Sequence, residues 1–216
     1  MPLEDYRSKR NFNATPEPAG RVRRGGRGRI FVVQKHDASR LHYDFRLLIN
    51  DVLVSWAVPN GPSMNPTERR LALRTEDHPL EYSDFEGVIP KGQYGAGTVM
   101  VWDKGTYEPD DGIPLDVQLA RGKIDVLLHG KKLRGGFTLV RTQKGLKASR
   151  AKERWLLVKR RDQYADSSFD IASPGLERSV LTGRTMKEIE QGRRSKRDMA
   201  VDRLRIRQDY GTSGRV

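Results

Sequence analysis

The sequence is divided into short runs rich in β-branched and aromatic residues, and this pattern constrains the fold more than any other feature. Gly, Pro, Asn and Asp separate the runs, which is typical of strands joined by turns. Asn50-Asp51 and His129-Gly130-Lys131 lie at such boundaries and predict hairpins. The pattern favours an all-β domain, either a closed barrel or a sandwich. The eight runs are 30–33, 42–49, 51–58, 70–75, 97–103, 123–130, 136–142 and 154–160.

Basic residues are concentrated at the two ends of the chain. Residues 1–29 hold 8 Lys/Arg against 3 Asp/Glu, and residues 182–216 hold 10 against 5. Residues 30–181 are nearly balanced, with 23 against 20, and we expect the folded domain there. The Gly/Arg stretch 20–29 should be flexible, and 185–204 is the best helix candidate, so the C-terminal tail should be partly helical or disordered. Such arms suit contact with phosphates or simple solubility.

Composition limits the classes of function. There is no cysteine among the 216 residues, which excludes disulfides, thiolate metal sites and thiol nucleophiles. No apolar run approaches the length of a membrane span, and the first ten residues lead into no signal core, so we expect a soluble cytosolic protein. The formal net charge of +13 indicates a polyanionic partner, with nucleic acid as the first candidate.

The stretch HDASRLHYDFR, residues 36–46, holds two of the four histidines of the chain. Because alternate side chains of a strand share a face, His42, Asp44 and Arg46 should lie together, with the aromatic residues between them facing a core. A turn over HDASR would bring His36 beside this face. The combination of imidazole, carboxylate and guanidinium on one patch suggests a binding or catalytic site rather than a solvated surface.

A further histidine, His78, precedes Pro79 in an extended or turn conformation. Two histidines and an aspartate can hold a divalent metal with open positions for water and substrate, and a neighbouring arginine suits a phosphate. His129 lies in a predicted turn, and we interpret it as a loop residue. GQYGAG, residues 92–97, precedes a strand and opens no helix, so we interpret it as a β-turn and not as a phosphate loop.

These residues are similar to a known family. FVVQKHDASRLHYDFRL, SWAVPNGPS, EDHPLEYSDFEGVIPKGQYGAGTV and VWDKGTY resemble the 3′-phosphoesterase domain of bacterial DNA ligase D, the ligase of non-homologous end joining. The similarity is dense from Lys9 to Tyr107 and looser to about residue 181. The string H-D-x-S-x-L-H-x-D-x-R is long and specific, and DHPLEY adds to it.

The resemblance implies a small closed β-barrel of about eight strands and a manganese-dependent enzyme, with cobalt or another divalent metal as a possible substitute. The activity it implies removes a 3′-terminal ribonucleoside and then hydrolyses the 3′-phosphate to a 3′-OH. The implied substrate is a DNA primer-template duplex with a 3′ ribonucleotide or 3′-phosphate end. The implied partners are an end-joining ligase, a polymerase and Ku. The implied location is cytoplasmic and nucleoid-associated, with no membrane.

Site residues follow from the matched positions. The metal ligands implied by the resemblance are His36, Asp44 and His78. The implied catalytic residues around the scissile phosphate are His42, Arg46 and Tyr82, with phosphate contacts from His42, Arg46 and Arg70. The implied supporting residues are Arg10, Glu17 and Glu76, which makes the N-terminal arm part of the site.

Two departures from the family pattern leave other functions open. Asn11 stands where the family usually has Asp, and Asn60 where it usually has Lys. A non-catalytic module that binds DNA ends is therefore one alternative. A non-haem iron oxygenase is another, because two histidines and a carboxylate on a β fold also match the facial triad of that class.

Overall fold

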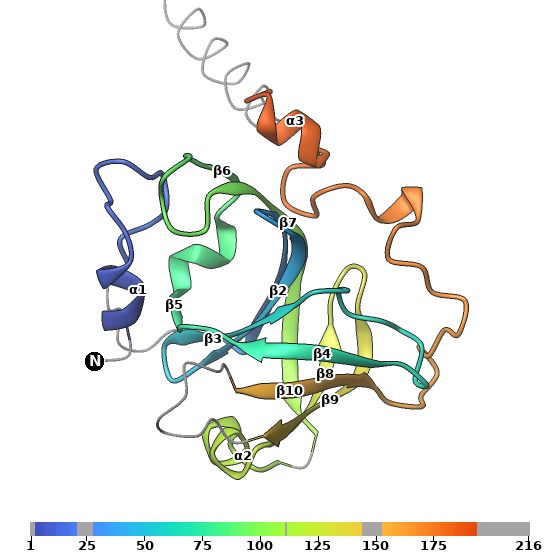
Figure 1. Ribbon diagram of the computed structural model, residues 1–216. Helices are drawn as coiled ribbons and strands as arrows, with labels where there is room; N and C mark the ends of the chain where they lie inside the picture. The colour runs from blue at the N-terminus through green and yellow to red at the C-terminus, as the bar shows by residue number, and fades with distance from the viewer. Residues whose placement is uncertain (1–2, 21–27, 111, 144–152, 194–216) are drawn as a thin grey trace, which may run out of the picture.

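The computed structural model of the chain describes residues 3–20, 28–110, 112–143 and 153–193 (Figure 1). Its barrel wall is built from β1 (Ile30–Asp37), β2 (Leu41–Ile49), β3 (Val52–Val58), β4 (Arg69–Arg74), β7 (Gly97–Pro109), β8 (Lys123–His129), β9 (Arg134–Gln143) and β10 (Arg154–Lys159). The remaining elements are β5 (His78–Pro79), β6 (Gly87–Ile89), the helices α1 (Glu4–Ser8), α2 (Leu115–Arg121) and α3 (Met186–Glu190), and the 3₁₀ turns η1 (Leu80–Asp84) and η2 (Pro174–Leu176).

Eight strands form a closed antiparallel barrel. Their order is β1-β2-β3-β4-β10-β9-β8-β7, and β7 pairs back with β1 from Ile30↔Thr106 to Asp37↔Thr98. This last ladder joins the two ends of the sheet, which distinguishes the fold from a sandwich. The predicted closed barrel of about eight strands is confirmed. Of the two short strands, β5 pairs with β3, and β6 extends the sheet from β7.

The predicted hairpins are confirmed. Asn50 and Asp51 have φ angles of 49° and 66°, so two left-handed residues join β2 to β3 as a tight hairpin requires. The β8–β9 hairpin closes at His129↔Arg134. The run predicted at 97–103 continues to Pro109, because β7 has to pair with β1, β6 and β8 along its length.

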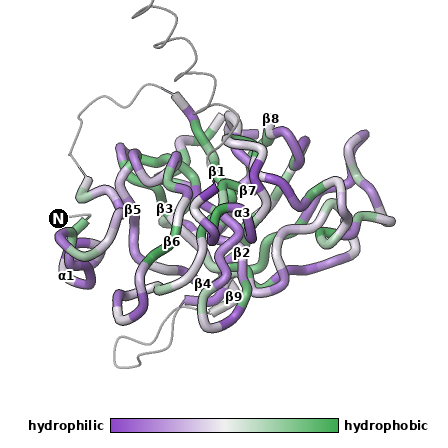
Figure 2. The backbone as a smooth tube through the Cα atoms, turned by 90° about the horizontal axis from the view of Figure 1, so that it is seen from above, coloured by the Kyte–Doolittle hydropathy of each residue, from purple (hydrophilic) through white to green (hydrophobic). Residues whose placement is uncertain are grey.

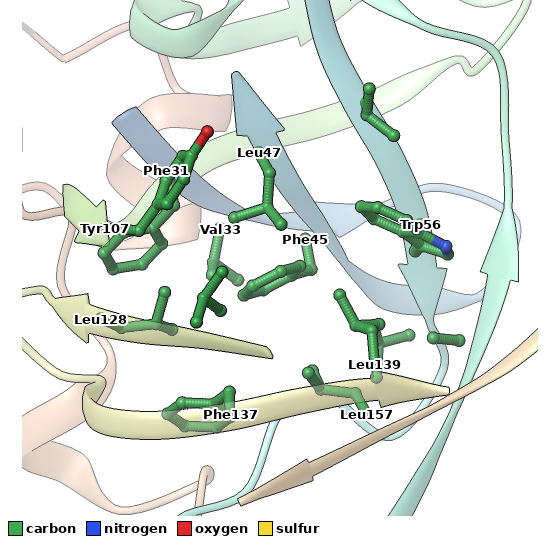
Figure 3. Close-up of a cluster of buried hydrophobic side chains, with 14 of the residues drawn as sticks. Phe31, Val33, Phe45, Leu47, Trp56, Tyr107, Leu128, Phe137, Leu139 and Leu157 are labelled. Carbon is green, nitrogen blue, oxygen red and sulfur yellow. The ribbon is translucent and has the colours of Figure 1, made fainter. Parts of the chain in front are cut away.

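The inner faces of the strands enclose the barrel core (Figure 3). From β1, Phe31 and Val33 point inward, and Phe45 and Leu47 follow the same alternation on β2. Trp56 joins them from β3 with no exposed surface. Full burial of each such side chain stabilises the fold by roughly 1.5–3 kcal/mol. The core face predicted for Tyr43 and Phe45 is confirmed, and Leu47 continues it.

A second hydrophobic cluster lies on the outside of the wall, and we call it the outer cluster. Val32, Leu48 and Leu53 point outward from β1, β2 and β3 and are covered by Tyr6 of α1 and Tyr82 of η1, among others. The N-terminal segment is largely hydrophilic (Figure 2), but Tyr6 is completely buried. This part of the wall therefore has apolar packing on both faces.

Both terminal segments pack on the barrel beyond the predicted domain limits of 30 and 181. On the C-terminal side, Thr182 and Arg184 donate hydrogen bonds to the buried carboxylate of Glu86, and α3 follows close to β6 and β7 (Figure 1). Thr185 and Glu188 form a capping box that begins α3. The predicted helix over 185–204 is thus present at its start, and its part beyond residue 193 lies outside the described residues. Most of the Gly/Arg stretch, 21–27, lies outside them as well.

No helix in the described part of the chain is both long and apolar enough to cross a membrane.

Candidate active site

Strand alternation and register gather polar side chains on the outer face of the barrel wall. On β2, His42, Asp44 and Arg46 share this face, and the residues between them enter the barrel core. On β1, His36 is the register partner of His42, and Gln34 is the partner of Asp44. Partners in an antiparallel pair project from the same face. The β1–β2 ladder therefore fixes the patch, and the face predicted for His42, Asp44 and Arg46 is confirmed.

His36, His42 and Asp44 form a three-residue group whose ligand atoms all lie within 4.8 Å of one another, and we call it the metal group. His36 Nδ1 lies 3.7 Å from Asp44 Oδ2, and His42 Nε2 lies 3.8 Å from Asp44 Oδ1. In the part of the chain that the structure describes, no other His, Cys, Asp or Glu residues converge in this way. Two imidazoles and a carboxylate suit a divalent transition metal with open coordination positions.

In each histidine of this group, the ring nitrogen that points away from Asp44 contacts a backbone carbonyl. His36 Nε2 lies 2.9 Å from the Gly95 oxygen, and His42 Nδ1 lies 2.9 Å from the Arg40 oxygen. Because a carbonyl only accepts, these nitrogens carry the proton in the neutral rings, and the nitrogens that face Asp44 keep their lone pairs. Metal-bound histidines are oriented by the same kind of outer hydrogen bond. The donor set therefore fits a metal ion in its chemistry as well as its position.

Arg46 is buried beside this group and anchored through every nitrogen of its guanidinium. Its Nε donates to Gln34 Oε1 at 2.9 Å, and its Nη1 donates to Ser55 Oγ at 2.8 Å. Its Nη2 donates to Asp44 Oδ2 at 2.9 Å. Burial by itself raises the pKa of Asp44, but the adjacent Arg46 guanidinium is the main influence that holds that pKa well below its usual range. Asp44 is therefore an ionised carboxylate, as a metal ligand must be.

His78 lies in the same cavity but against arginines. Its Nδ1 is 2.8 Å from Arg46 Nη1 and 2.9 Å from the Glu76 carbonyl oxygen, and its Nε2 is 3.3 Å from Arg10 Nη2. Burial and the positive charges of Arg46 and Arg10 lower the pKa of His78 well below 6.5, so the ring is neutral. Both ring nitrogens already have partners. This geometry favours His42 over His78 as the third member of the metal group.

The N-terminal segment supports the cavity through one buried carboxylate. Glu17 Oε1 accepts from Arg10 Nε at 2.8 Å and from the Tyr82 hydroxyl at 3.0 Å, while Oε2 accepts from the Thr15 hydroxyl at 2.9 Å. The Arg10 guanidinium lies 3.9 Å from the centre of the Tyr6 ring. Burial raises the pKa of Tyr82 well above 10, so its phenol remains a donor. Glu17 thus positions both Arg10 and Tyr82 from a segment more than sixty residues away from Tyr82.

Glu76 extends this support to the rim of the cavity, where it pairs with Lys9 Nζ at 3.2 Å and Arg10 Nη1 at 3.4 Å. The cavity has a volume of about 250 Å³. Its lining includes the metal group and most of the residues predicted for the site, namely Arg10, Arg46, Glu76, His78 and Tyr82.

Arg70, Asn60 and Asn11 were also singled out from the sequence, and none of them lines the cavity. Arg70 pairs with Glu68, and its Nη1 donates to the Asn60 carbonyl oxygen at 3.4 Å. Neither Arg70 nor Asn60 lines the cavity. Asn11 is exposed, and its carbonyl accepts from the backbone of Ala14. The predicted phosphate contact of Arg70 stays a prediction.

Several contributors were not predicted as site residues. Gln34 and Ser55 anchor Arg46, and only the strand register places them opposite Asp44 and Arg46. Gly95 and Tyr94 belong to the GQYGAG stretch, which is a turn, as predicted, but also borders the cavity. The sequence signal that could have indicated their place at the cavity was an aromatic residue between glycines. A larger cavity of about 600 Å³ at the β8–β9 hairpin contains His129, which is not part of the metal group.

Comparison with known proteins gives a consistent picture. Residues 34–141, half of the chain, match the family described as the DNA ligase D 3′-phosphoesterase domain. A multifunctional non-homologous end joining protein LigD from Pseudomonas aeruginosa is 49% identical over 189 residues, which cover 86% of this chain and 22% of that protein.

Two mycobacterial proteins are similar over nearly the same extent. The LigD protein of Mycobacterium tuberculosis, described as a multifunctional non-homologous end joining DNA repair protein, is 42% identical over 169 residues, or 78% of this chain and 21% of its own length. The LigD protein of Mycolicibacterium smegmatis is 43% identical over 175 residues, or 79% of this chain and 22% of its own. The chain spans about a fifth of the length of these relatives.

Proposed function

The chain belongs to the DNA ligase D 3′-phosphoesterase family, and from this premise we propose that it is a metal-dependent hydrolase that processes 3′ ends of DNA for end joining. In detail, we expect it to remove a 3′-terminal ribonucleoside by phosphodiester cleavage. We expect it then to hydrolyse the resulting 3′-phosphate and leave a 3′-OH. The observation that carries the proposal is the convergence of His36, His42 and Asp44 within 4.8 Å beside two buried arginines.

In this proposal, His36, His42 and Asp44 hold the metal. A bound divalent ion would neutralise phosphate charge and lower the pKa of a coordinated water. The donor set accepts several first-row metals, so the choice of manganese, with cobalt as a substitute, rests on the family resemblance. Assigning His42 as a ligand replaces His78 in the set implied by the sequence, because His42 has an oriented lone pair facing Asp44 and His78 does not.

The remaining residues of the cavity act on the phosphate and its surroundings. Arg46 and Arg10 present positive charge that is held rigidly by Gln34, Ser55 and Glu17, so little reorganisation is needed when a phosphate binds. Neutral His78 lies between the two guanidinium groups and can exchange a hydrogen bond with a phosphate oxygen or a leaving oxygen. Tyr82 acts through Glu17 on the position of Arg10 and is a positioning residue.

The substrate we propose is a DNA primer-template duplex that ends in a 3′ ribonucleotide or a 3′-phosphate. The excess of basic residues in segments 1–29 and 182–216 supports contact with the duplex backbone. The relatives are named as end-joining proteins. The partners we propose are therefore other components of end joining, namely a ligase, a polymerase and Ku. A role at the ends of broken chromosomal DNA predicts a cytoplasmic, nucleoid-associated location in a bacterial cell.

One experiment tests this proposal directly. A labelled primer-template with a single 3′ ribonucleotide is incubated with the chain in manganese or in chelator. We expect two successive products with manganese, first a 3′-phosphate and then a 3′-OH, and none in chelator. Asp44→Asn is the matched control, because it keeps the shape of the side chain and removes the ligand charge. Tight binding of the duplex without any product would favour the non-catalytic end-binding module instead.

A further inference from the structure

The connection between β6 and β7 ties an exposed tyrosine to the metal group. Two successive turns shape it, with Gln93 N bonded to the Pro90 oxygen and Ala96 N to the Gln93 oxygen. Gly95 has a φ of 76°, which a residue with a side chain adopts only under strain. The Gly95 carbonyl accepts from His36 Nε2 at 2.9 Å. The residue before it, Tyr94, is therefore held close to the metal group.

Tyr94 contributes a ring to the cavity but not to the folded core. It lines the cavity, and its relative exposure is 45%. Among the described residues, neither the barrel core nor the outer cluster includes it. Lys9 Nζ lies 5.0 Å and the Arg10 guanidinium carbon 5.5 Å from the centre of its ring. An exposed aromatic ring beside positive charges, at the rim of a polar cavity, is the arrangement that proteins use to bind nucleobases and phosphates together.

The size of the cavity limits which part of a DNA end can meet this ring. About 250 Å³ is less than the space that drug-sized ligands occupy, so a duplex stays outside. Only the extreme 3′ end of a strand can enter. In the proposed reaction a phosphate lies at the metal group, and we expect the nucleoside beyond that phosphate to reach the rest of the lining, which includes Tyr94.

We propose that Tyr94 is a stacking platform for the 3′-terminal nucleoside of the substrate, the nucleoside that the reaction releases. This inference rests on the proposed function and adds a specificity residue to it. Stacking on an aromatic ring tolerates every base, because each base has a π face. The site should accordingly accept all four terminal nucleosides and discriminate against an end that lacks a base.

The test is a cycle between the Tyr94 ring and the terminal base. Two primer-templates differ only at the 3′ terminus, which is a ribonucleotide or a stable abasic ribose analogue. Wild type, Tyr94→Leu and Tyr94→Phe are compared on both. Affinity is measured by fluorescence anisotropy in chelator, where no turnover occurs, and cleavage rates are measured in manganese. Tyr164→Leu is the matched control, because Tyr164 is similarly exposed, at 42%, but lines the larger cavity at the β8–β9 hairpin.

We expect loss of the base to weaken binding and cleavage by wild type and by Tyr94→Phe about 5- to 150-fold, the range of base stacking on an aromatic side chain. The same change should cost Tyr94→Leu about twofold or less, while Tyr164→Leu should behave as wild type. If losing the base costs Tyr94→Leu as much as wild type, the stacking proposal is wrong, even where cleavage proceeds. If wild type gives no metal-dependent product, the proposed function fails, and the affinity cycle in chelator still decides the role of Tyr94.

Discussion

Arg46 Nη2 donates to Asp44 Oδ2 at 2.9 Å from two positions along the same strand. The contact engages the Oδ2 atom of the carboxylate, and the Oδ1 atom faces His42. Because Gln34 and Ser55 hold the same guanidinium, the carboxylate is fixed in orientation before any metal arrives. Preorganisation of this kind lowers the cost of assembling a metal site.

The first prediction concerns the ligands of the metal. His36→Ala, His42→Ala and Asp44→Asn should each weaken manganese or cobalt binding by about 100-fold or more, because each removes a donor of a three-residue set. Isothermal titration with cobalt measures this without turnover. Their effects on cleavage should be strongly non-additive, because one lost ligand already disables the site.

His78→Asn separates the two possible ligand sets. It should weaken metal binding by less than about tenfold, since His78 lies against Arg46 and Arg10. A loss as large as that of His36→Ala would instead support His36, Asp44 and His78 as the ligands.

The second prediction concerns the buried carboxylate of Glu17. Glu17→Gln should lower the free energy of unfolding by about 3 kcal/mol, because it removes the closer of the two carboxylates that pair with the buried Arg10 guanidinium and leaves only the longer contact with Glu76. Tyr82→Phe should cost only about 1 kcal/mol, the worth of a single hydrogen bond. Urea unfolding of both variants measures the difference. Equal losses would mean that Arg10 does not depend on the charge of Glu17.

The third prediction separates residues 182–193, which pack on the barrel, from the tail formed by residues 194–216. Ending the chain after Arg193 should keep the thermal stability and weaken duplex binding with a flatter salt dependence, because residues 194–216 carry 7 Lys/Arg against 3 Asp/Glu. Ending it after Leu181 should also lower the melting temperature, since Glu86 loses Thr182 and Arg184. Thermal melts and salt titrations of duplex affinity test the two cuts. An unchanged salt dependence after the first cut would make the tail a solubility device.

The fourth prediction concerns pH and Lys132. Burial lowers the pKa of Lys132 to about 8, despite the nearby Asp103 carboxylate, and its Nζ donates to the carbonyls of Leu176 and Arg178 at 2.8 Å. The unfolded chain binds this proton more tightly, with a pKa near 10.5. Unfolding therefore takes up a proton between about pH 8 and 10.5, and the stability contributed by this residue rises with pH across that window.

Lys132→Met isolates this contribution, because other titrating groups affect both proteins alike. The unfolding free energy of wild type relative to the variant should rise by about 1–2 kcal/mol from pH 8 to 10.5, after allowance for the partial exposure of the side chain. Urea titrations at several pH values measure it. A difference that stays constant or falls over this window would contradict the prediction.

The sequence by itself determined the local geometry of the strands and hairpins, and it determined that three site residues share one face. Alternation along residues 42–47 is set by the two-residue period of a strand, so it places His42, Asp44 and Arg46 on one face in any fold that keeps the strand. Asn50 and Asp51 tolerate the left-handed conformation, which fixes the β2–β3 hairpin locally. The matched motifs then indicated the family.

Tertiary structure alone decided which polar groups meet on that face. The β1–β7 ladder closes the barrel, Gly95 orients His36 from 59 positions away, and Arg10 reaches His78 across 68 positions. Such contacts depend on how distant segments pack, and no local period or propensity encodes them. The choice between His42 and His78 is of this kind. Both lie near Asp44 in the fold, but the ring nitrogens of His78 face Arg46, Arg10 and the Glu76 carbonyl. His42 instead uses Nδ1 for the Arg40 carbonyl and turns Nε2 toward Asp44.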